Sequence, residues 1–177
     1  MLWGIDFAAL WANVWVKAVV INLGAAVVGF IFDKVVARVL VMLTSKTRTD
    51  IDDKIIAVLH KPIFWSVTLG GAWWAIHVLA LPRPAPFILF GIVKTAAVFI
   101  WIRAFLNIGT IFLTWIAEAQ DKLSIVQPRT LPLFDIAVKV VVVGGGTYAM
   151  LLAWDINVTG WLASAGILGL AIGFAAK

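Results

Sequence analysis

The sequence contains no cysteine, and only 13% of its 177 residues are charged. Without cysteine, the chain has no disulfide framework, no thiol nucleophile and no thiolate metal site. Soluble domains are on average about 25% charged and about 45–50% apolar, whereas 63% of this chain is hydrophobic. A soluble protein of this size could not bury so much apolar surface, so lipid must be part of the solvent of this protein.

Five long apolar segments predict an all-α, polytopic membrane protein with about five transmembrane helices. Each segment reaches the roughly 20 residues that a bilayer-spanning helix needs, and such runs are too long and too uniformly apolar for barrel strands. The last two segments are joined by the very short connection Asp155-Ile156-Asn157, so we expect them to be antiparallel neighbours. The segments are Phe7–Phe32 with an amphipathic continuation to Leu43, Ile63–Leu81, Phe87–Ile116, Leu131–Trp154 and Val158–Ala176.

Lysine and arginine gather on alternate connections, which predicts the orientation of the chain. Because cytoplasmic loops carry an excess of these residues, we expect a multi-pass inner-membrane protein with its N-terminus outside, on the periplasmic side, and its C-terminus in the cytoplasm. The net charge of +5 favours contact with anionic lipid over nucleic-acid binding. The opposite side carries Arg83 and, near a helix end, Lys94. The basic residues of the first and third connections and their flanks are Lys34, Arg38, Lys46, Arg48, Lys54, Lys61, Lys122 and Arg129.

The last apolar segment carries small residues on two of its sides. At 3.6 residues per turn, one narrow helix face holds Ala163, Gly166, Leu170, Phe174 and Lys177. One flank of this face holds Gly169, Gly173 and Ala176, and the other holds Ser164, Ala171 and Ala175. The back of the helix holds Trp161, Leu168 and Ile172.

Two small-residue flanks suit a helix that packs tightly against a neighbour on each side. A ring of identical helices provides this, because the glycine flank of one copy meets the alanine flank of the next. The narrow face then lines a hole, in which Leu170 and Phe174 form an apolar constriction that dewets and blocks ions. Lys177 would lie just below, at the cytoplasmic exit. The alternative is a helix of an ordinary membrane bundle, where small residues serve close packing alone.

Three stretches resemble the small-conductance mechanosensitive channel family. LeuAlaSerAlaGlyIleLeuGlyLeuAlaIleGlyPheAlaAlaLys resembles the pore helix, and the preceding TrpAspIleAsnValThrGly resembles the short turn into it. ThrAspIleAspAspLysIle, residues 49–55, resembles the polar linker of members with two extra N-terminal helices. The chain stops at Lys177 directly after an apolar helix, so we expect an N-terminal fragment that ends in the pore helix. A complete small protein is the alternative.

The resemblance implies a subunit of a homoheptameric, tension-gated channel that releases ions and small solutes in osmotic downshock. Its partners would be the lipid bilayer, its own copies and the permeating ions. Leu170 and Phe174 fall at the pore-constricting positions, where phenylalanine replaces the usual second leucine, and Lys177 replaces a polar residue at the pore exit. The small-residue packing positions are Ala163, Gly166, Gly169, Ala171 and Gly173.

This interpretation divides the chain into four parts. Residues 1–43 form a first membrane helix with an amphipathic extension, and residues 44–61 form a polar cytoplasmic linker. Residues 62–130 hold the second and third membrane helices with their loop. Residues 131–177 form the channel core, with the fourth membrane helix and the pore helix.

Two other function classes are alternatives. A secondary transporter, or another multi-helix membrane bundle, would show repeats and polar midplane groups, and we find no convincing repeat and few such groups. A membrane-embedded enzyme would need convergent acids, histidines or a serine dyad at one depth, whereas Ser66 and Ser164 have no evident base. We therefore expect no enzymatic activity, cofactor or metal.

The remaining polar residues have local explanations. Three acids favour the start of a helix over a metal site, and the two histidines are too far apart to form an evident metal pair. Lys139 and Asp135 lie four residues apart on one helix face and should pair. The triple glycine 144–146 is a candidate hinge or close-packing site. The three acids are Asp50, Asp52 and Asp53, and the histidines are His60 and His77.

Overall fold

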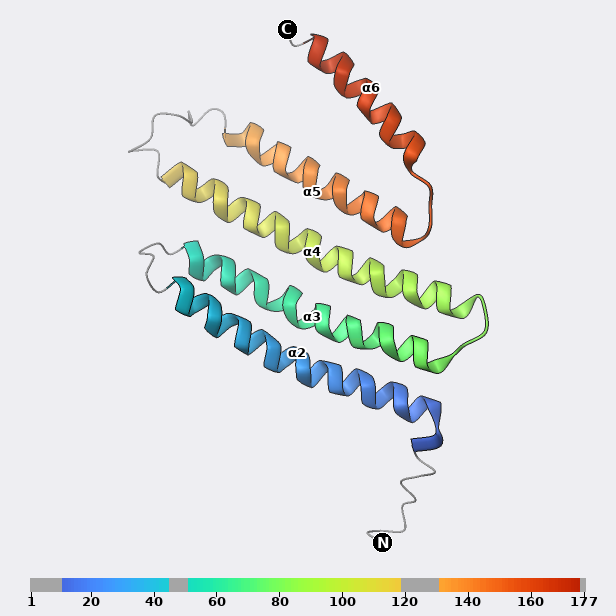
Figure 1. The fold of residues 1–177 in the computed structure, drawn as a ribbon. Coiled ribbons are helices and arrows are strands. Elements are labelled where there is room, and N and C mark those ends of the chain that lie inside the picture. Colours follow the sequence, from blue (N-terminus) through green and yellow to red (C-terminus); the bar gives the residue numbers. More distant parts are fainter. Residues whose placement is uncertain (1–10, 45–50, 119–130, 176–177) are drawn as a thin grey trace.

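The computed structural model describes residues 11–44, 51–118 and 131–175, and no strand occurs in these ranges. The helices labelled in Figure 1 are α2 (Val14–Thr44), α3 (Ile51–Leu79), α4 (Ala85–Glu118), α5 (Leu131–Ala153) and α6 (Thr159–Ala175). Four of them, α2 to α5, are long and apolar enough to cross a membrane. The prediction of an all-α, polytopic membrane protein is therefore confirmed.

The last helix is described over fewer residues than the predicted segment, whose end lies outside the described residues. Its 17 residues span about 26 Å at 1.5 Å per residue, which is less than the roughly 30 Å hydrocarbon core. The described residues thus contain four helices of spanning length and one shorter apolar helix. Spanning length is therefore confirmed for four of the five predicted segments.

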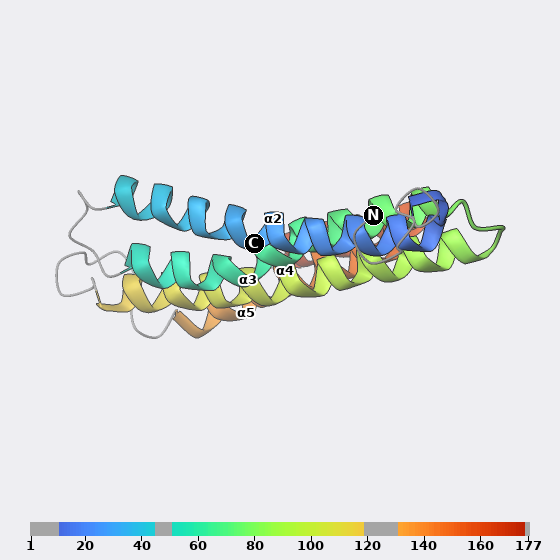
Figure 2. The ribbon, with the colours of Figure 1, turned by 90° about the horizontal axis from the view of Figure 1, so that it is seen from below.

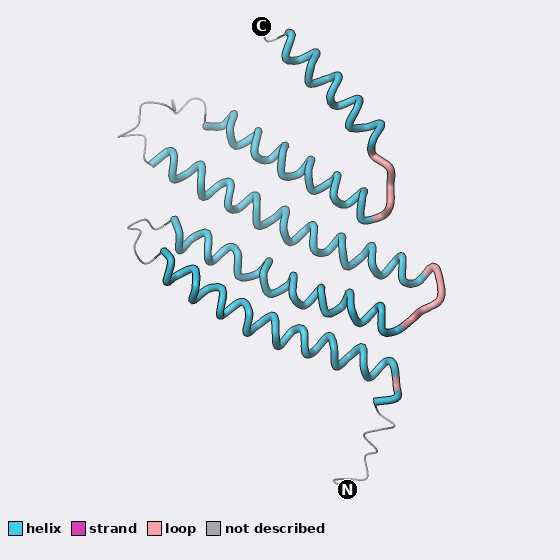
Figure 3. The backbone as a smooth tube through the Cα atoms, viewed as in Figure 1, coloured by secondary structure: helices cyan, strands magenta, loops and turns pink. Residues whose placement is uncertain are grey.

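Helices α2 to α5 lie side by side in one antiparallel layer (Figures 1 and 3). Each contacts only its neighbours in sequence, since the contacting pairs among the described helices are α2–α3, α3–α4 and α4–α5. Seen edge-on, the layer is a thin band (Figure 2). A layer of this kind leaves two broad faces uncovered by its own chain.

Small residues let neighbouring helices of the layer approach closely. A Cβ added at Gly71 of α3 would collide with Ala25 of α2, and one at Gly146 of α5 would collide with Ile102 of α4. Within lipid there is little hydrophobic drive for helices to associate, so close van der Waals packing of this kind holds them together. The close-packing alternative for the triple glycine thus holds at Gly146, whereas Gly144 and Gly145 meet nothing within 4 Å.

The single chain buries very little. Its buried hydrophobic residues are mostly small, and no polar or charged side chain of the described residues is buried. Long apolar side chains instead face outward along the layer, as Val141 does at 72% exposure. Such a surface must be covered by lipid or by other protein chains. The buried hydrophobic residues are Ala18, Ile56, Ala75, Ile76, Ala104, Ala153 and Val158.

The connections agree with the sequence in one place and differ in another. The stretch with Pro82 and Pro84 turns between α3 and α4, as proline favours, and the Ala85 amide donates to the Pro82 carbonyl (3.2 Å). In contrast, α3 begins at Ile51, so residues 51–61 of the predicted polar linker are helical. Asp52 and Asp53 stand in the first turn of α3, where acids favour a helix start. The helix therefore starts well before the apolar run does.

Candidate functional site

The turn between α5 and α6 sets the direction of the candidate pore helix. Asp155 adopts a left-handed backbone conformation (φ 54°), and the Ile156 amide donates to the Leu151 carbonyl (3.0 Å). The Asn157 side chain accepts a hydrogen bond from the Thr159 amide (3.0 Å), which caps the first turn of α6. The chain thus reverses within a few residues. However, α6 makes no contact with α5, so the expectation that these two helices are neighbours is wrong for the described residues of a single chain.

Trp154, directly after α5, fixes this turn onto α4. Its indole N–H donates to the Thr95 hydroxyl (2.9 Å), and its ring meets Phe87 edge-on, with the ring centroids 6.0 Å apart. Gly91 leaves room for the indole ring, because a Cβ at this position would lie only 3.0–3.1 Å from the indole atoms. Phe87, Gly91 and Thr95 are spaced by four residues and share one face of α4. The start of α6 is therefore tied to the helix layer.

Beyond this turn, α6 stands apart from the rest of the chain. It diverges from α5 in Figure 1, and it contacts no other helix of the described residues. Every residue from Thr159 to Ala175 is exposed. Leu170 is 64% and Phe174 is 78% exposed, although both are large and apolar. No other helix among the described residues covers any side of this helix.

The glycines of α6 show the same lack of neighbours. Gly166, Gly169 and Gly173 each have open space within 4 Å of an added Cβ. Glycine lowers helix stability relative to alanine by about 1 kcal/mol, so three of them in one short helix need a compensating use. Close approach of a further helix would supply it.

The helix carries every predicted pore residue that the structure describes. Leu170 and Phe174 lie one turn apart on the same face, and Ala163 and Ala171 are exposed like the glycines. Lys177, the predicted pore exit, lies outside the described residues. That Leu170 and Phe174 line a pore stays a prediction, because it depends on neighbours beyond this chain.

Other candidate residues have the following positions. Lys139 donates to Asp135 (2.7 Å), so the predicted pair on one face of α5 is confirmed. The ring of His77 packs against Phe90, with ring centroids 4.7 Å apart. Asp50, one of the three acids, lies outside the described residues.

Sequence reasoning missed a set of polar bonds between neighbouring helices. His60 of α3 bonds Asp33 of α2 (2.8 Å), and Trp101 of α4 donates to Ser66 of α3 (3.1 Å). The hydrogen bond from Trp154 to Thr95 likewise joins residues that are far apart in the sequence. The partners lie between 27 and 59 residues apart, so no local spacing links them. The four-residue spacing of Phe87, Gly91 and Thr95 was a usable signal for one side of the Trp154 contact.

Comparison with known proteins points to this same end of the chain. A family model described as mechanosensitive ion channel, transmembrane helices 2/3, matches residues 137–177. This range holds most of α5, the anchored turn and all of α6.

One curated relative matches over a longer stretch. It is an uncharacterized MscS family protein of Aquifex aeolicus (strain VF5), 29% identical over 148 residues, which is 80% of this chain. The chain spans 38% of that relative's length. No solved structure matches the chain. Over its last two helices and, at 29% identity, over most of its length, the chain is therefore similar to the MscS family of mechanosensitive ion channels.

Proposed function

We propose that the chain is a channel subunit whose α6 helices, one from each copy, form a ring around a tension-gated pore. The observation that carries this proposal is the full exposure of α6, together with glycines that have open space beside them. Small residues on two flanks let other helices approach α6 closely, which gives van der Waals contact beyond that with lipid. Identical neighbours would fill both of its small-residue flanks and bury them in a closed ring.

The gate is the apolar face that such a ring turns inward. Leu170 and Phe174 would stack as two rings of large apolar side chains, one helical turn apart. A narrow constriction of this kind excludes water and therefore ions. The resemblance to the small-conductance channels implies seven copies, and ions and small solutes released in osmotic downshock would be the permeating species.

Force would reach the gate through the anchored turn. The layer of α2 to α5 exposes broad apolar faces to lipid, and tension favours the state with the larger in-plane area. The bond between Trp154 and Thr95 (2.9 Å) makes the start of α6 follow the layer. Outward movement of the layer would tilt and separate the α6 helices and wet the constriction.

Patch-clamp recording of the full-length protein tests the gate. Leu170→Ser should lower the tension threshold or produce a leak, because a hydroxyl ring wets the constriction. Leu168→Ser is a matched control, since Leu168 and Leu170 are equally exposed at 64% but lie on opposite sides of α6. Equal behaviour of the two variants, or an unchanged threshold in Leu170→Ser, would remove Leu170 from the gate.

We further propose that the turn between α3 and α4 faces the periplasm and that the linkers on the other side face the cytoplasm, as the basic residues favour. The sequence lacks cysteine, so a single Arg83→Cys substitution gives a unique label site in the described turn. A membrane-impermeant maleimide added outside spheroplasts should label this variant, whereas Lys54→Cys should react only after lysis. The reverse pattern would invert the topology.

A further inference from the structure

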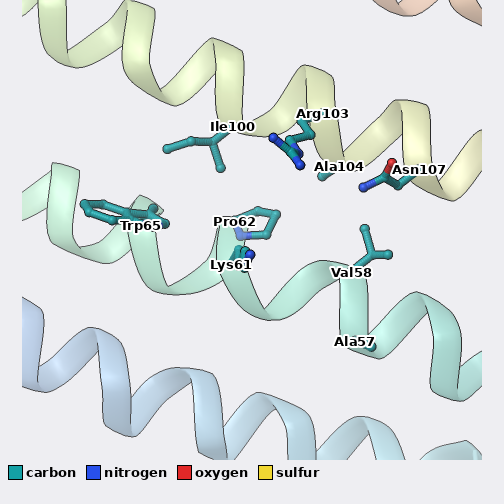
Figure 4. A pocket seen from close by; sticks show the side chains of 9 residues that line it. All are labelled: Ala57, Val58, Lys61, Pro62, Trp65, Ile100, Arg103, Ala104 and Asn107. Carbon is teal, nitrogen blue, oxygen red and sulfur yellow. The ribbon is translucent and has the colours of Figure 1, made fainter.

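A pocket between α3 and α4 presents two basic side chains far from the candidate pore helix. It has a volume of about 360 Å³, and Lys61 of α3 and Arg103 of α4 both line it. Figure 4 shows the side chains of Pro62 and Trp65 on α3 and those of Ile100 and Asn107 on α4 around the same space. Lys61, Trp65, Arg103 and Asn107 are exposed, so the pocket opens onto the surface of the layer.

Neither basic residue of the pocket has an acidic partner within the part of the chain that the structure describes. The salt bridges there join other residues, such as Lys139 and Asp135. Two cations in one pocket repel each other unless an anion lies between them. The pocket therefore has the charge of a site for a negatively charged group.

The two cations lie at the same depth. Lys61 stands 18 residues before the end of α3 at Leu79, and Arg103 stands 18 residues after the start of α4 at Ala85. The two helix ends meet in the turn at 80–84. Eighteen residues correspond to about 27 Å of helix, and the hydrocarbon core is roughly 30 Å thick. If the turn marks one membrane surface, both cations reach the phosphate level of the opposite leaflet.

The pocket changes from polar to apolar along its length. Trp65 and Ile100 lie about one helical turn from the cations toward the membrane centre. Asn107 lies one turn from Arg103 in the other direction, toward the linkers. Pro62 has no backbone N–H to donate, so α3 lacks one intrahelical hydrogen bond at the level of the cations. A ligand that fits this order carries a polar head, an anionic group and an apolar tail.

We propose that this pocket binds an anionic phospholipid of the cytoplasmic leaflet. Arg103 and Lys61 hold the phosphate, since a guanidinium can donate two parallel hydrogen bonds to phosphate oxygens. The first part of an acyl chain lies against Trp65 and Ile100, and Asn107 meets the headgroup. The assignment to the cytoplasmic leaflet depends on the proposed orientation of the chain. The preference for an anionic phospholipid does not depend on it. Basic pockets between transmembrane helices are a known means of binding lipid headgroups.

Native mass spectrometry of the purified full-length protein in detergent tests the site. Phosphatidylglycerol and the zwitterionic phosphatidylcholine are titrated against the parent protein, Lys61→Gln, Arg103→Gln and the double variant. Each lost cation should weaken phosphatidylglycerol binding about fivefold and leave phosphatidylcholine binding unchanged. Lys34→Gln is the control, because Lys34 lies at a similar depth, 20 residues after the start of α2, but outside the pocket.

Three results would overturn the proposal. The first is parent-like phosphatidylglycerol binding by the double variant, and the second is an equal loss in Lys34→Gln, which would indicate nonspecific surface charge. The third is binding of inorganic phosphate as strong as that of the lipid, which would mean a free anion site. This experiment measures lipid binding and does not depend on channel activity. A failure of the lipid-site proposal is therefore distinguishable from a failure of the gate proposal, which Leu170→Ser tests.

Discussion

Helices α2 to α5 and helix α6 use small residues in opposite ways within one chain. In the layer, Gly71 and Gly146 each meet a side chain of the neighbouring helix, and a polar bond joins each neighbouring pair. In α6, Gly166, Gly169 and Gly173 meet nothing, and no contact with another described helix is formed. At these two glycines the layer thus makes its helix contacts within the chain. Any helix that packs against the glycines of α6 must lie outside the residues that the structure describes.

The largest effect on unfolding stability is expected at a glycine that already contacts a neighbouring helix. Gly71→Leu would force α2 and α3 apart at Ala25 and should lower the free energy of unfolding by about 3 kcal/mol. Gly70→Leu is the matched control, because an added Cβ at Gly70 meets nothing within 4 Å. Denaturant unfolding in micelles measures both variants. Similar stability of the two would contradict the role of close packing in the layer.

The same substitution in α6 should act on assembly instead of on the single chain. Gly169→Leu should reduce the oligomer seen by native mass spectrometry to smaller species, since the glycine flank could no longer approach a neighbour. The stability of the dissociated chain should not fall and should rise by up to about 1 kcal/mol, because leucine favours the helix more than glycine does. Ile172→Leu, on the back of the helix, should keep the oligomer. An intact oligomer in Gly169→Leu, or a monomeric or dimeric parent protein, would favour a transporter-like bundle.

The anchor between the two regions should have an intermediate effect. Trp154→Phe and Thr95→Val each remove one partner of the 2.9 Å bond. A double-mutant cycle on unfolding should return a coupling of about 0.6 kcal/mol, typical of hydrogen bonds between membrane helices. In patch-clamp, both single variants should shift the tension threshold in the same direction. A coupling of zero would mean that the bond does not tie α6 to the layer.

The smallest effect is expected at the ion pair of α5. Lys139 is 58% exposed as a side chain, and pairs four residues apart on a helix surface contribute about 0.2–0.5 kcal/mol. Lys139→Gln should therefore lower unfolding stability by no more than this amount. A loss above about 1 kcal/mol would reveal a contact of Lys139 beyond Asp135, with another copy of the chain as the first candidate.

The sequence predicted most of the membrane helices because apolar runs and breakers mark them directly. The predicted segments Phe87–Ile116 and Leu131–Trp154 end within two residues of α4 and α5, since prolines and polar residues flank both. The three acids favoured a helix start that agrees with α3, which begins at Ile51, but residues 51–61 were assigned to a linker because they are polar. Hydropathy locates the membrane, but it does not show how far a helix extends beyond it.

The sequence named the residues of the candidate site but not the contacts around it. The wheel of α6 separates Leu170 from Leu168 by helical period alone. It cannot reveal that Trp154 bonds Thr95, because those residues lie 59 positions apart. Nor can one sequence count copies, since the proposed ring would close through contacts between chains.

Disulfide cross-linking in membranes tests the ring most directly, because the chain has no cysteine of its own. A double variant with Gly169→Cys and Ala171→Cys places one thiol on each flank of α6. Oxidation should give a ladder of bands that ends in one closed oligomer, whereas Leu168→Cys with Ile172→Cys, on the back, should stay monomeric. A monomer from the flank variant, or a ladder from the back variant, would contradict the proposal that α6 lines a ring of copies.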